Sequence, residues 1–176
     1  MSPEISSAII LRIMRSVLHA SYRDGRYGRP HEKCGILRGR GHRITAADRT
    51  NNVSSEPEIA FEIDPAQLLA AYKAQRKANA LQIMGFYHTH LTDDPTPSVR
   101  DAEGAAPDGM LWLIATSMRA RLWRAVPNGS IHGRFEPVHF DLKVGKQLRP
   151  GLLDIQHVDY GKDYEIRIEG LPSGLS

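Results

Sequence analysis

The chain has 176 residues, of which 41% are hydrophobic and 24% are charged, as expected for one globular domain with its own core. Its 23 Lys and Arg residues against 20 Asp and Glu residues give a net charge of +3, which is too small to predict a nucleic-acid partner. The single cysteine excludes an intramolecular disulfide, and no stretch approaches the roughly 20 apolar residues that span a membrane. Because the N-terminal residues lack the pattern of a secretory signal, we expect a cytoplasmic protein.

The first third of the chain predicts a helix followed by strands. Apolar residues recur at helical spacing through Ile9, Ile13 and Val17, which indicates an amphipathic helix. The glycines and the proline of "YRDGRYGRP" end it. The strands expected next are "CGILRGRG" and "HRITAADRT", which form a hairpin joined through residues 39–41, and then "AFEID".

A second helix is predicted where Asp64 supplies an N-cap and Pro65 the first helical position of "AQLLAAYKAQRKANA". Further along the chain we expect a strand in "LQIMGFYHTH", a short helix in "SVRDAEGAA", and strands in "GMLWLIATS" and "RARLWRAV". This order of elements predicts a mixed α/β domain, with a central β-sheet flanked by helices.

The sequence divides into a main domain, residues 1–142, and a C-terminal extension, residues 143–176. In the extension "YEIRIE" alternates apolar and charged residues as an exposed strand does, and the final "GLPSGLS" is expected to be disordered. The sequence leaves the oligomeric state open.

Two histidines end the predicted strand at residues 81–90. Side chains alternate faces along a strand, so His88 and His90 project from the same side and are placed to share one metal ion. A catalytic zinc site takes three protein ligands, and Asp101 is the best candidate for the third, since it falls in the first turn of the short helix. Ser98 and Asp101 also match a capping box, so by itself Asp101 is more often a helix cap than a ligand. Asp93 and Asp94 are expected to shape the intervening loop.

Metal-assisted hydrolysis also needs a base that is not a ligand, and Glu32 is placed for this role. It precedes a strand that could run beside the histidine strand, where Cys34 and Gly35 are too small to block the approach. Taken alone, Glu32 would be an ordinary solvated acid. A nucleophilic Cys34 is an alternative, although a lone cysteine before an apolar run is more often a small buried residue.

These residues together resemble the JAMM motif of the JAB/MPN+ zinc metalloprotease family, and the resemblance covers roughly residues 5 to 125. The matching positions are Glu32, Cys34, Gly35, Ile36, Leu37, Gly85, Phe86, Tyr87, His88, Thr89, His90, Pro97, Ser98 and Asp101. The sequence departs from the family pattern at Thr89, where Ser is more usual, and at Leu91, where a proline often follows the second histidine. The short segment after Asp101 resembles the small prokaryotic members.

The resemblance implies a cytidine-deaminase-like α/β fold and one Zn²⁺ per chain, held by His88, His90 and Asp101. It implies Glu32 as general base and acid, and Ser98 as a hydrogen-bond donor to the oxyanion of the tetrahedral intermediate. The reaction implied is hydrolysis of the peptide or isopeptide bond after the C-terminal glycine of a ubiquitin-like or sulfur-carrier protein with a Gly-Gly tail.

Three other functions stay open at this stage. A non-catalytic MPN-type scaffold would bind a ubiquitin-like partner through the same groove. A zinc deaminase would share the fold, but the Cys-X-X-Cys ligand pair of that class is absent from the sequence. The basic and aromatic residues of "RARLWRAV" are compatible with nucleic-acid binding, and an alternating strand explains them equally well.

Overall fold

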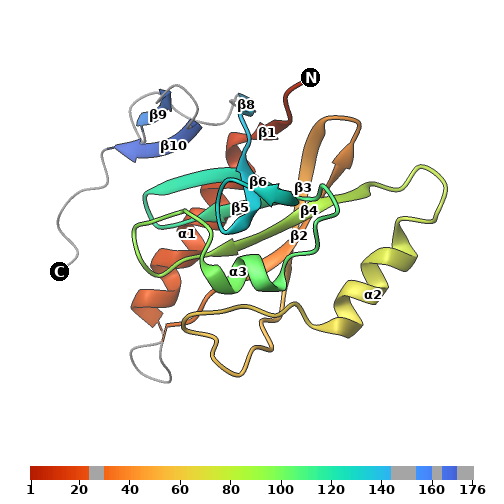
Figure 1. Cartoon of the computed structure of the whole chain (residues 1–176), viewed down its shortest axis with the longest axis horizontal. Helices are drawn as coiled ribbons and strands as arrows, with labels where there is room; N and C mark the ends of the chain where they lie inside the picture. The colour runs from red at the N-terminus through yellow and green to blue at the C-terminus, as the bar shows by residue number, and fades with distance from the viewer. Residues whose placement is uncertain (24–29, 144–153, 160–163, 170–176) are drawn as a thin grey trace.

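The computed structural model describes residues 1–23, 30–143, 154–159 and 164–169. Three helices and ten strands occur in these residues (Figure 1). They follow in the order β1 (Glu4–Ser6), α1 (Ser7–Arg23), β2 (Cys34–Arg40), β3 (Arg43–Thr50), α2 (Pro65–Ala74), β4 (Gln82–Thr89), α3 (Val99–Gly104), β5 (Leu111–Ala115), β6 (Arg119–Gly129), β7 (Gly133–Pro137), β8 (Asp141–Lys143), β9 (Asp154–Asp159) and β10 (Tyr164–Glu169).

The strands form one mixed sheet in the order β8-β1-β3-β2-β4-β5-β6-β10-β9, and β7 pairs with β6 outside this path. The predicted hairpin is confirmed: β2 and β3 are antiparallel, and Gly41 in the turn has a φ of +59°, which a glycine adopts without strain. The turn is shorter than expected, because Gly39 lies inside β2, next to an irregularity in the pairing. The central pair, β4 and β5, is parallel.

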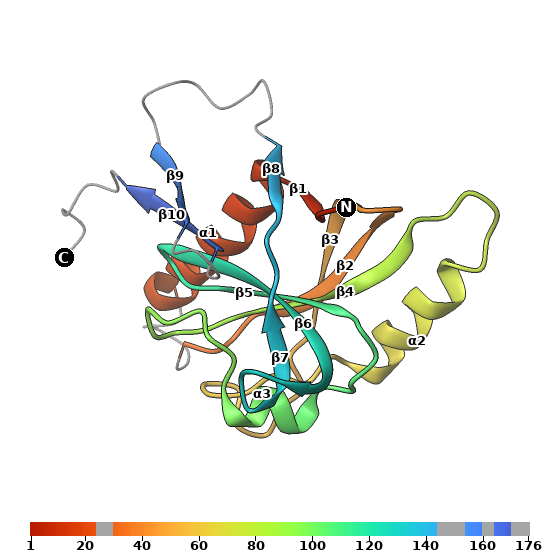
Figure 2. The ribbon, with the colours of Figure 1, turned by 45° about the horizontal axis from the view of Figure 1, so that its top comes forward.

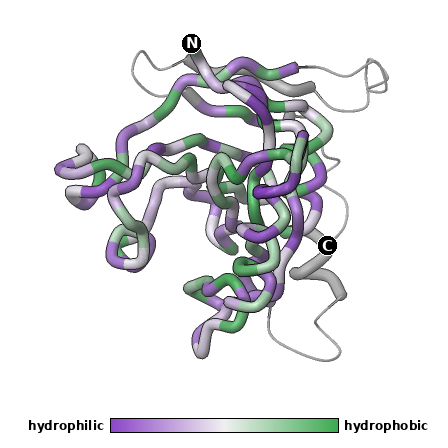
Figure 3. Tube along the Cα trace, turned by 90° about the vertical axis from the view of Figure 1, so that its right-hand side faces the viewer, coloured by the Kyte–Doolittle hydropathy of each residue, from purple (hydrophilic) through white to green (hydrophobic). Residues whose placement is uncertain are grey.

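The sheet is covered on both faces, with α1 on one side and α3 on the other (Figure 1). The strand β5 is buried throughout and serves both cores. Its Leu111 and Leu113 pack with α1, whereas Trp112 and Ile114 pack with the α3 side. Figure 3 shows hydrophobic and hydrophilic residues alternating along much of the trace, as expected for strands and amphipathic helices.

The second helix differs from its neighbours because none of its residues is buried. Asp64 caps α2 through its side chain, which accepts from the N–H of Ala66, and Pro65 opens the helix as predicted. The helix ends at Ala74, several residues earlier than its helix-forming composition suggests. It stands at the outer margin of the molecule (Figures 1 and 2).

The prediction of a strand at "AFEID" is wrong. Only an isolated bridge joins Ile63 to Asn52. The Asn52 side chain binds the segment instead: its amide donates to the carbonyl of Ala60, and its Oδ1 accepts from the N–H of Glu62. Side-chain hydrogen bonds of this kind compete with strand pairing for the backbone groups.

The C-terminal extension adds two strands to the sheet. β10 pairs antiparallel with β6 on one side and with β9 on the other (Figure 2). The strand predicted at "YEIRIE" is therefore confirmed, but its exposed character is wrong, because Ile166 and Glu165 are 1% and 2% exposed. "GLPSGLS", residues 24–29 and residues 144–153 lie outside the described part of the chain. Among the described residues, no helix has the length and hydrophobicity that crossing a membrane requires.

Candidate metal centre

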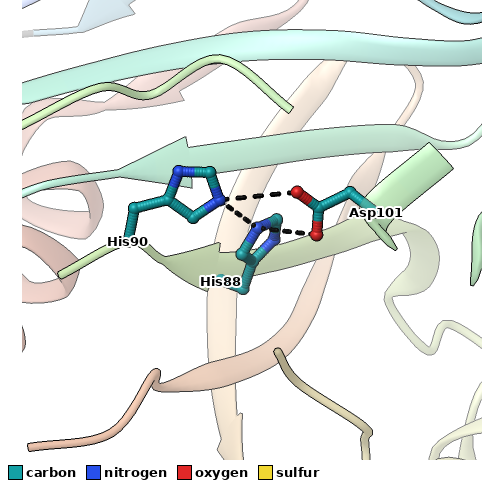
Figure 4. Close-up of side chains that lie close together, drawn as sticks. All are labelled: His88, His90 and Asp101. Atoms are coloured by element: carbon teal, nitrogen blue, oxygen red, sulfur yellow. Dashed lines mark hydrogen bonds and ion pairs between the residues drawn. The ribbon is translucent and has the colours of Figure 1, made fainter. Parts of the chain in front are cut away.

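Two neighbouring elements bring the histidines and Asp101 together. His88 lies near the end of β4 and His90 just beyond it, and α3 begins so that Asp101 falls in its first turn. The Nε2 atoms of His88 and His90 are 3.0 Å apart. The Asp101 carboxylate faces both rings, with Oδ1 3.2 Å from His88 Nε2 and Oδ2 3.4 Å from His90 Nε2 (Figure 4). All three side chains are buried or nearly so.

Asp101 has a geometry that suits both roles that the sequence left as alternatives. It completes a capping box with Ser98: the Ser98 hydroxyl accepts from the N–H of Asp101, while Asp101 Oδ2 accepts from the N–H and the hydroxyl of Ser98, both at 2.7 Å. The cap fixes the carboxylate with both oxygens facing the histidines. A helix cap and a metal ligand are therefore compatible in this residue.

The contacts of His90 and His88 differ. His90 donates from Nδ1 to the carbonyl of Asp94 at 2.7 Å, and in the neutral ring this leaves the lone pair on Nε2 directed at the centre. His88 is stacked on Phe61, with ring centroids 4.3 Å apart, and meets Trp112 edge-on. Its Nδ1 has no hydrogen-bond partner among the described residues. Hydrogen bonding thus orients one ring, and aromatic packing the other.

The electrostatic environment keeps His88 neutral and the Asp101 carboxylate ionised. Burial lowers the pKa of His88, and metal binding requires the neutral imidazole that results. Burial works against ionisation of Asp101, but the neighbouring His88 and polar contacts with both imidazoles and with Ser98 hold the pKa of Asp101 well below its usual range. The centre therefore contains an ionised carboxylate beside two imidazoles.

The antiparallel pairing of β2 with β4 places Glu32 near this centre. Cys34 is paired with His88, and the N–H of Lys33 donates to the Thr89 hydroxyl at 2.9 Å. Glu32 is 5% exposed and close enough to His90 and Asp101 for their charges to affect it. Burial is the main cause that raises the pKa of Glu32 to about 8. The residue is not the solvated acid that its sequence context alone suggests.

The donor set fits a zinc ion. One ligand atom from each of His88, His90 and Asp101 lies within 4.8 Å of the other two. Two imidazoles and one carboxylate are a ligand set of catalytic zinc, and three ligands leave one position open. The described residues contain no second group of this kind.

Cys34 does not have the properties of a nucleophile. It is fully buried, its Sγ lies 3.4 Å from the Thr50 hydroxyl, and burial raises the pKa of its thiol. Reactive cysteines have a lowered pKa and are accessible. Cys34 is therefore a small core residue.

The sequence analysis missed Phe61 and the cavity that it borders. This cavity measures about 520 Å³ and reaches Asp101; Phe86 and Trp112 also line it. Phe61 lies on an irregular segment far from the motif in sequence. Its sequence signal is that of an apolar residue inside the misassigned "AFEID" strand.

Comparison with known proteins agrees with this geometry. The prokaryotic homologues of the JAB domain match residues 14–126. The chain belongs to this family.

Individual proteins are similar to this chain over stretches of different length. A desampylase from Haloferax volcanii is 37% identical over 99 residues, which is 53% of this chain and 70% of that protein. A desampylase from Pyrococcus furiosus is 34% identical over 83 residues, which is 47% of this chain and 58% of that protein. The solution structure of a Desulfitobacterium hafniense protein has a TM-score of 0.59 at 21% identity and covers 82% of this chain and 94% of that one. The predicted JAB1/MPN fold class, a mixed α/β sheet with helices, is confirmed.

Proposed function

We propose that this protein is a zinc-dependent hydrolase that cleaves the peptide or isopeptide bond after the C-terminal glycine of a ubiquitin-like protein. The observation that carries the proposal is the convergence of His88, His90 and Asp101 on one point, with the buried carboxyl of Glu32 beside it. The two desampylases support the substrate class, since their name denotes removal of a ubiquitin-like modifier.

His88, His90 and Asp101 would hold the zinc ion. When bound, zinc supplies Lewis acidity, which polarises a carbonyl oxygen and activates water for attack. The ordering of His90 by the Asp94 carbonyl, and of Asp101 by Ser98, fixes the ligands before the ion arrives. Such preorganisation reduces the entropy that the side chains lose when the ion binds.

Glu32 would accept the proton of the attacking water and pass it to the leaving amine. A carboxyl whose pKa burial raises to about 8 is a better proton acceptor than an ordinary glutamate, and it can return the proton near neutral pH. The positive charge of a bound zinc ion would lower this pKa and favour the ionised, accepting form.

Ser98 would donate a hydrogen bond to the oxyanion of the tetrahedral intermediate. In the structure its hydroxyl proton is directed at Asp101 Oδ2. The proposed role requires the hydroxyl to rotate toward the substrate once the Asp101 carboxylate is held by the ion.

The burial of the candidate metal centre favours a substrate whose C-terminal tail consists of small residues. His88 and Asp101 are 0% and 6% exposed, so a scissile bond reaches them only on a chain without bulky side chains. A Gly-Gly tail on a ubiquitin-like or sulfur-carrier protein meets this requirement. The cavity bordered by Phe61 and Trp112 offers an apolar surface for the residues that precede the tail.

The test is cleavage of a fusion that joins a ubiquitin-like protein ending in Gly-Gly to a reporter. We expect cleavage by the zinc-loaded parent and loss of zinc and activity in His88→Ala. Glu32→Gln should keep about one zinc per chain and lose activity by a factor of about 10² to 10⁴. Metal content is measured by mass spectrometry on the same samples.

The results separate the parts of the proposal. An active, zinc-loaded Glu32→Gln protein would exclude Glu32 as the base. A zinc-loaded parent that binds the fusion without cleaving it would instead favour the non-catalytic scaffold. A parent that binds no zinc would refute the proposed metal centre.

A further inference from the structure

The loop that follows His90 is held in place by side chains from β6 and from the turn that precedes it. Arg119 Nη1 donates to the carbonyl of Asp93 at 2.9 Å, and the indole N–H of Trp123 donates to the carbonyl of Pro95 at 3.0 Å. The Thr116 hydroxyl donates to Asp93 Oδ1 at 3.1 Å. Between these two held carbonyls lies the carbonyl of Asp94, which accepts the Nδ1 proton of His90. The position of the His90 ring thus depends on how firmly residues 93–95 are fixed.

Arg119 is itself held by the C-terminal extension. The Glu165 carboxylate in β10 accepts two hydrogen bonds from its guanidinium, from Nε at 2.9 Å and from Nη2 at 2.6 Å. A bidentate pair fixes the plane of the guanidinium as well as its position, which a lysine in the same place would not do. The third nitrogen, Nη1, is thereby directed at the Asp93 carbonyl.

The burial of Glu165 indicates that this contact does more than join two strands. Glu165 is 2% exposed, and Arg167 donates a further hydrogen bond to its Oε1 at 2.6 Å. A buried ion pair is weak evidence for stability, because an apolar residue of similar size at such a site is often neutral or stabilising. The orientation that the Glu165 carboxylate imposes on the Arg119 guanidinium is a better explanation for a carboxylate at this position. Residue 165 also lies beyond residues 14–126, the part of the chain that the family matches.

We infer that Glu165 is a positioning residue for the metal ligand His90, acting through Arg119 and the backbone of residues 93–95. The strand β10 therefore completes the support of the metal centre. This inference rests on the proposed zinc site, and it makes tight metal binding depend on the C-terminal extension.

The test measures zinc affinity by competition with a chromophoric chelator for the full-length parent, Glu165→Gln, Arg119→Lys and the double variant. Glu165→Gln keeps the shape of the side chain, and Arg119→Lys keeps its charge. Loss of a group that orients a ligand weakens metal binding by roughly 10- to 100-fold, and we expect about tenfold from each single change. Because the two residues act in series, the double variant should also lose about tenfold rather than a hundredfold.

Two further readouts separate positioning from general destabilisation. Asp48→Asn removes the ion pair between Arg38 and Asp48 on β2 and β3, away from the loop, and should leave zinc affinity unchanged. In the cobalt-substituted protein, the visible absorption of the ion should change in the Glu165 and Arg119 variants and not in Asp48→Asn.

The inference is overturned if both single variants bind zinc as tightly as the parent, if their effects multiply in the double variant, or if Asp48→Asn weakens binding equally. A parent that binds no zinc would instead refute the proposed metal centre itself. The two failures are therefore distinguishable.

Discussion

At the scale of single residues, the metal centre depends on side chains that each serve two contacts. Asp101 caps α3 and faces two histidines, and Ser98 binds Asp101 through both its backbone and its hydroxyl. Changing either residue is therefore expected to affect a helix as well as a proposed metal ligand. The two effects can be measured separately, because the loss of a helix cap changes the free energy of unfolding and the loss of a ligand changes the metal content.

Ser98→Ala removes the N-cap hydroxyl and leaves the three proposed ligands in place. We expect a loss of about 1 kcal/mol in the free energy of unfolding, with zinc still bound at saturating metal. Asp101→Ala should lose the reciprocal half of the capping box, in which its carboxylate accepts from the N–H of Ser98, and the zinc as well. Urea unfolding and metal analysis of both variants check this; full zinc retention by Asp101→Ala would leave the residue as a cap alone.

The raised pKa of Glu32 predicts that the stability of the metal-free protein depends on pH. Because burial raises the pKa of Glu32 from 4.5 to about 8, the folded protein keeps a proton there that the unfolded chain has released. The contribution of Glu32 therefore lowers the free energy of unfolding as the pH rises from 4.5 to about 8. Glu32→Gln should be more stable than the parent at pH 8.5, by an amount on the order of a few kcal/mol, and nearly equal at pH 4.

Unfolding of both metal-free proteins across this pH range checks the prediction. A difference between them that stays constant with pH would show that Glu32 titrates as an exposed carboxyl does.

The residues that the sequence predicted correctly are those governed by local rules. Alternation along a strand placed His88 and His90 on one side, and the capping pattern placed Asp101 in a first helical turn. Phe61 against His88 and Glu165 against Arg119 depend on contacts between distant segments, for which periodicity gives no signal. The burial of Glu165 even reverses what its alternating strand suggests.

At the scale of elements, the centre is built on the tight pairing of β4 with β5. A Cβ atom on Gly85 would overlap the backbone carbonyl oxygen of Leu111 in the neighbouring strand. Gly85→Ala should therefore separate the strands near His88 and lower the free energy of unfolding by about 3 kcal/mol. Gly104→Ala is the matched control, because a Cβ there meets nothing within 4 Å, and alanine favours a helix.

Thermal and urea unfolding of the two glycine variants give the measurement. Equal stabilities would mean that the two strands can move apart without cost.

Elements with clear periodicity or capping signals were predicted well, and the shortest strands were not. The helix at α1 and the strands at β2 to β6 follow from apolar spacing and breakers. β1 and β8 have three residues each, too few for a period to be visible, and they form only through pairing with each other and, for β1, with β3. α2 ends early because the chain must turn toward β4, where the Gln75 side chain accepts from the N–H of Ile83.

At the scale of the whole molecule, a metal ion that binds only the folded state raises the stability of the entire domain. Zinc at 100 times its dissociation constant adds about 2.7 kcal/mol, which corresponds to a rise in Tm of roughly 5 to 10 °C for a domain of this size. His88→Ala should lack this rise. Differential scanning fluorimetry with and without zinc checks both, and an equal rise in the variant would indicate binding elsewhere.

The place of β1 also has a kinetic consequence. This strand opens the chain but lies between β3 and β8, and Glu4 pairs with both Arg43 and Asp141. The β2–β3 hairpin can form from residues close in sequence, whereas the far edge of the sheet closes only after residues 141–143 have been synthesised. Pairings between distant segments are slow, since the entropy of closing the intervening loop is lost before the contact forms. We therefore expect closure of this edge, rather than formation of the hairpin, to set the rate at which the newly made chain folds.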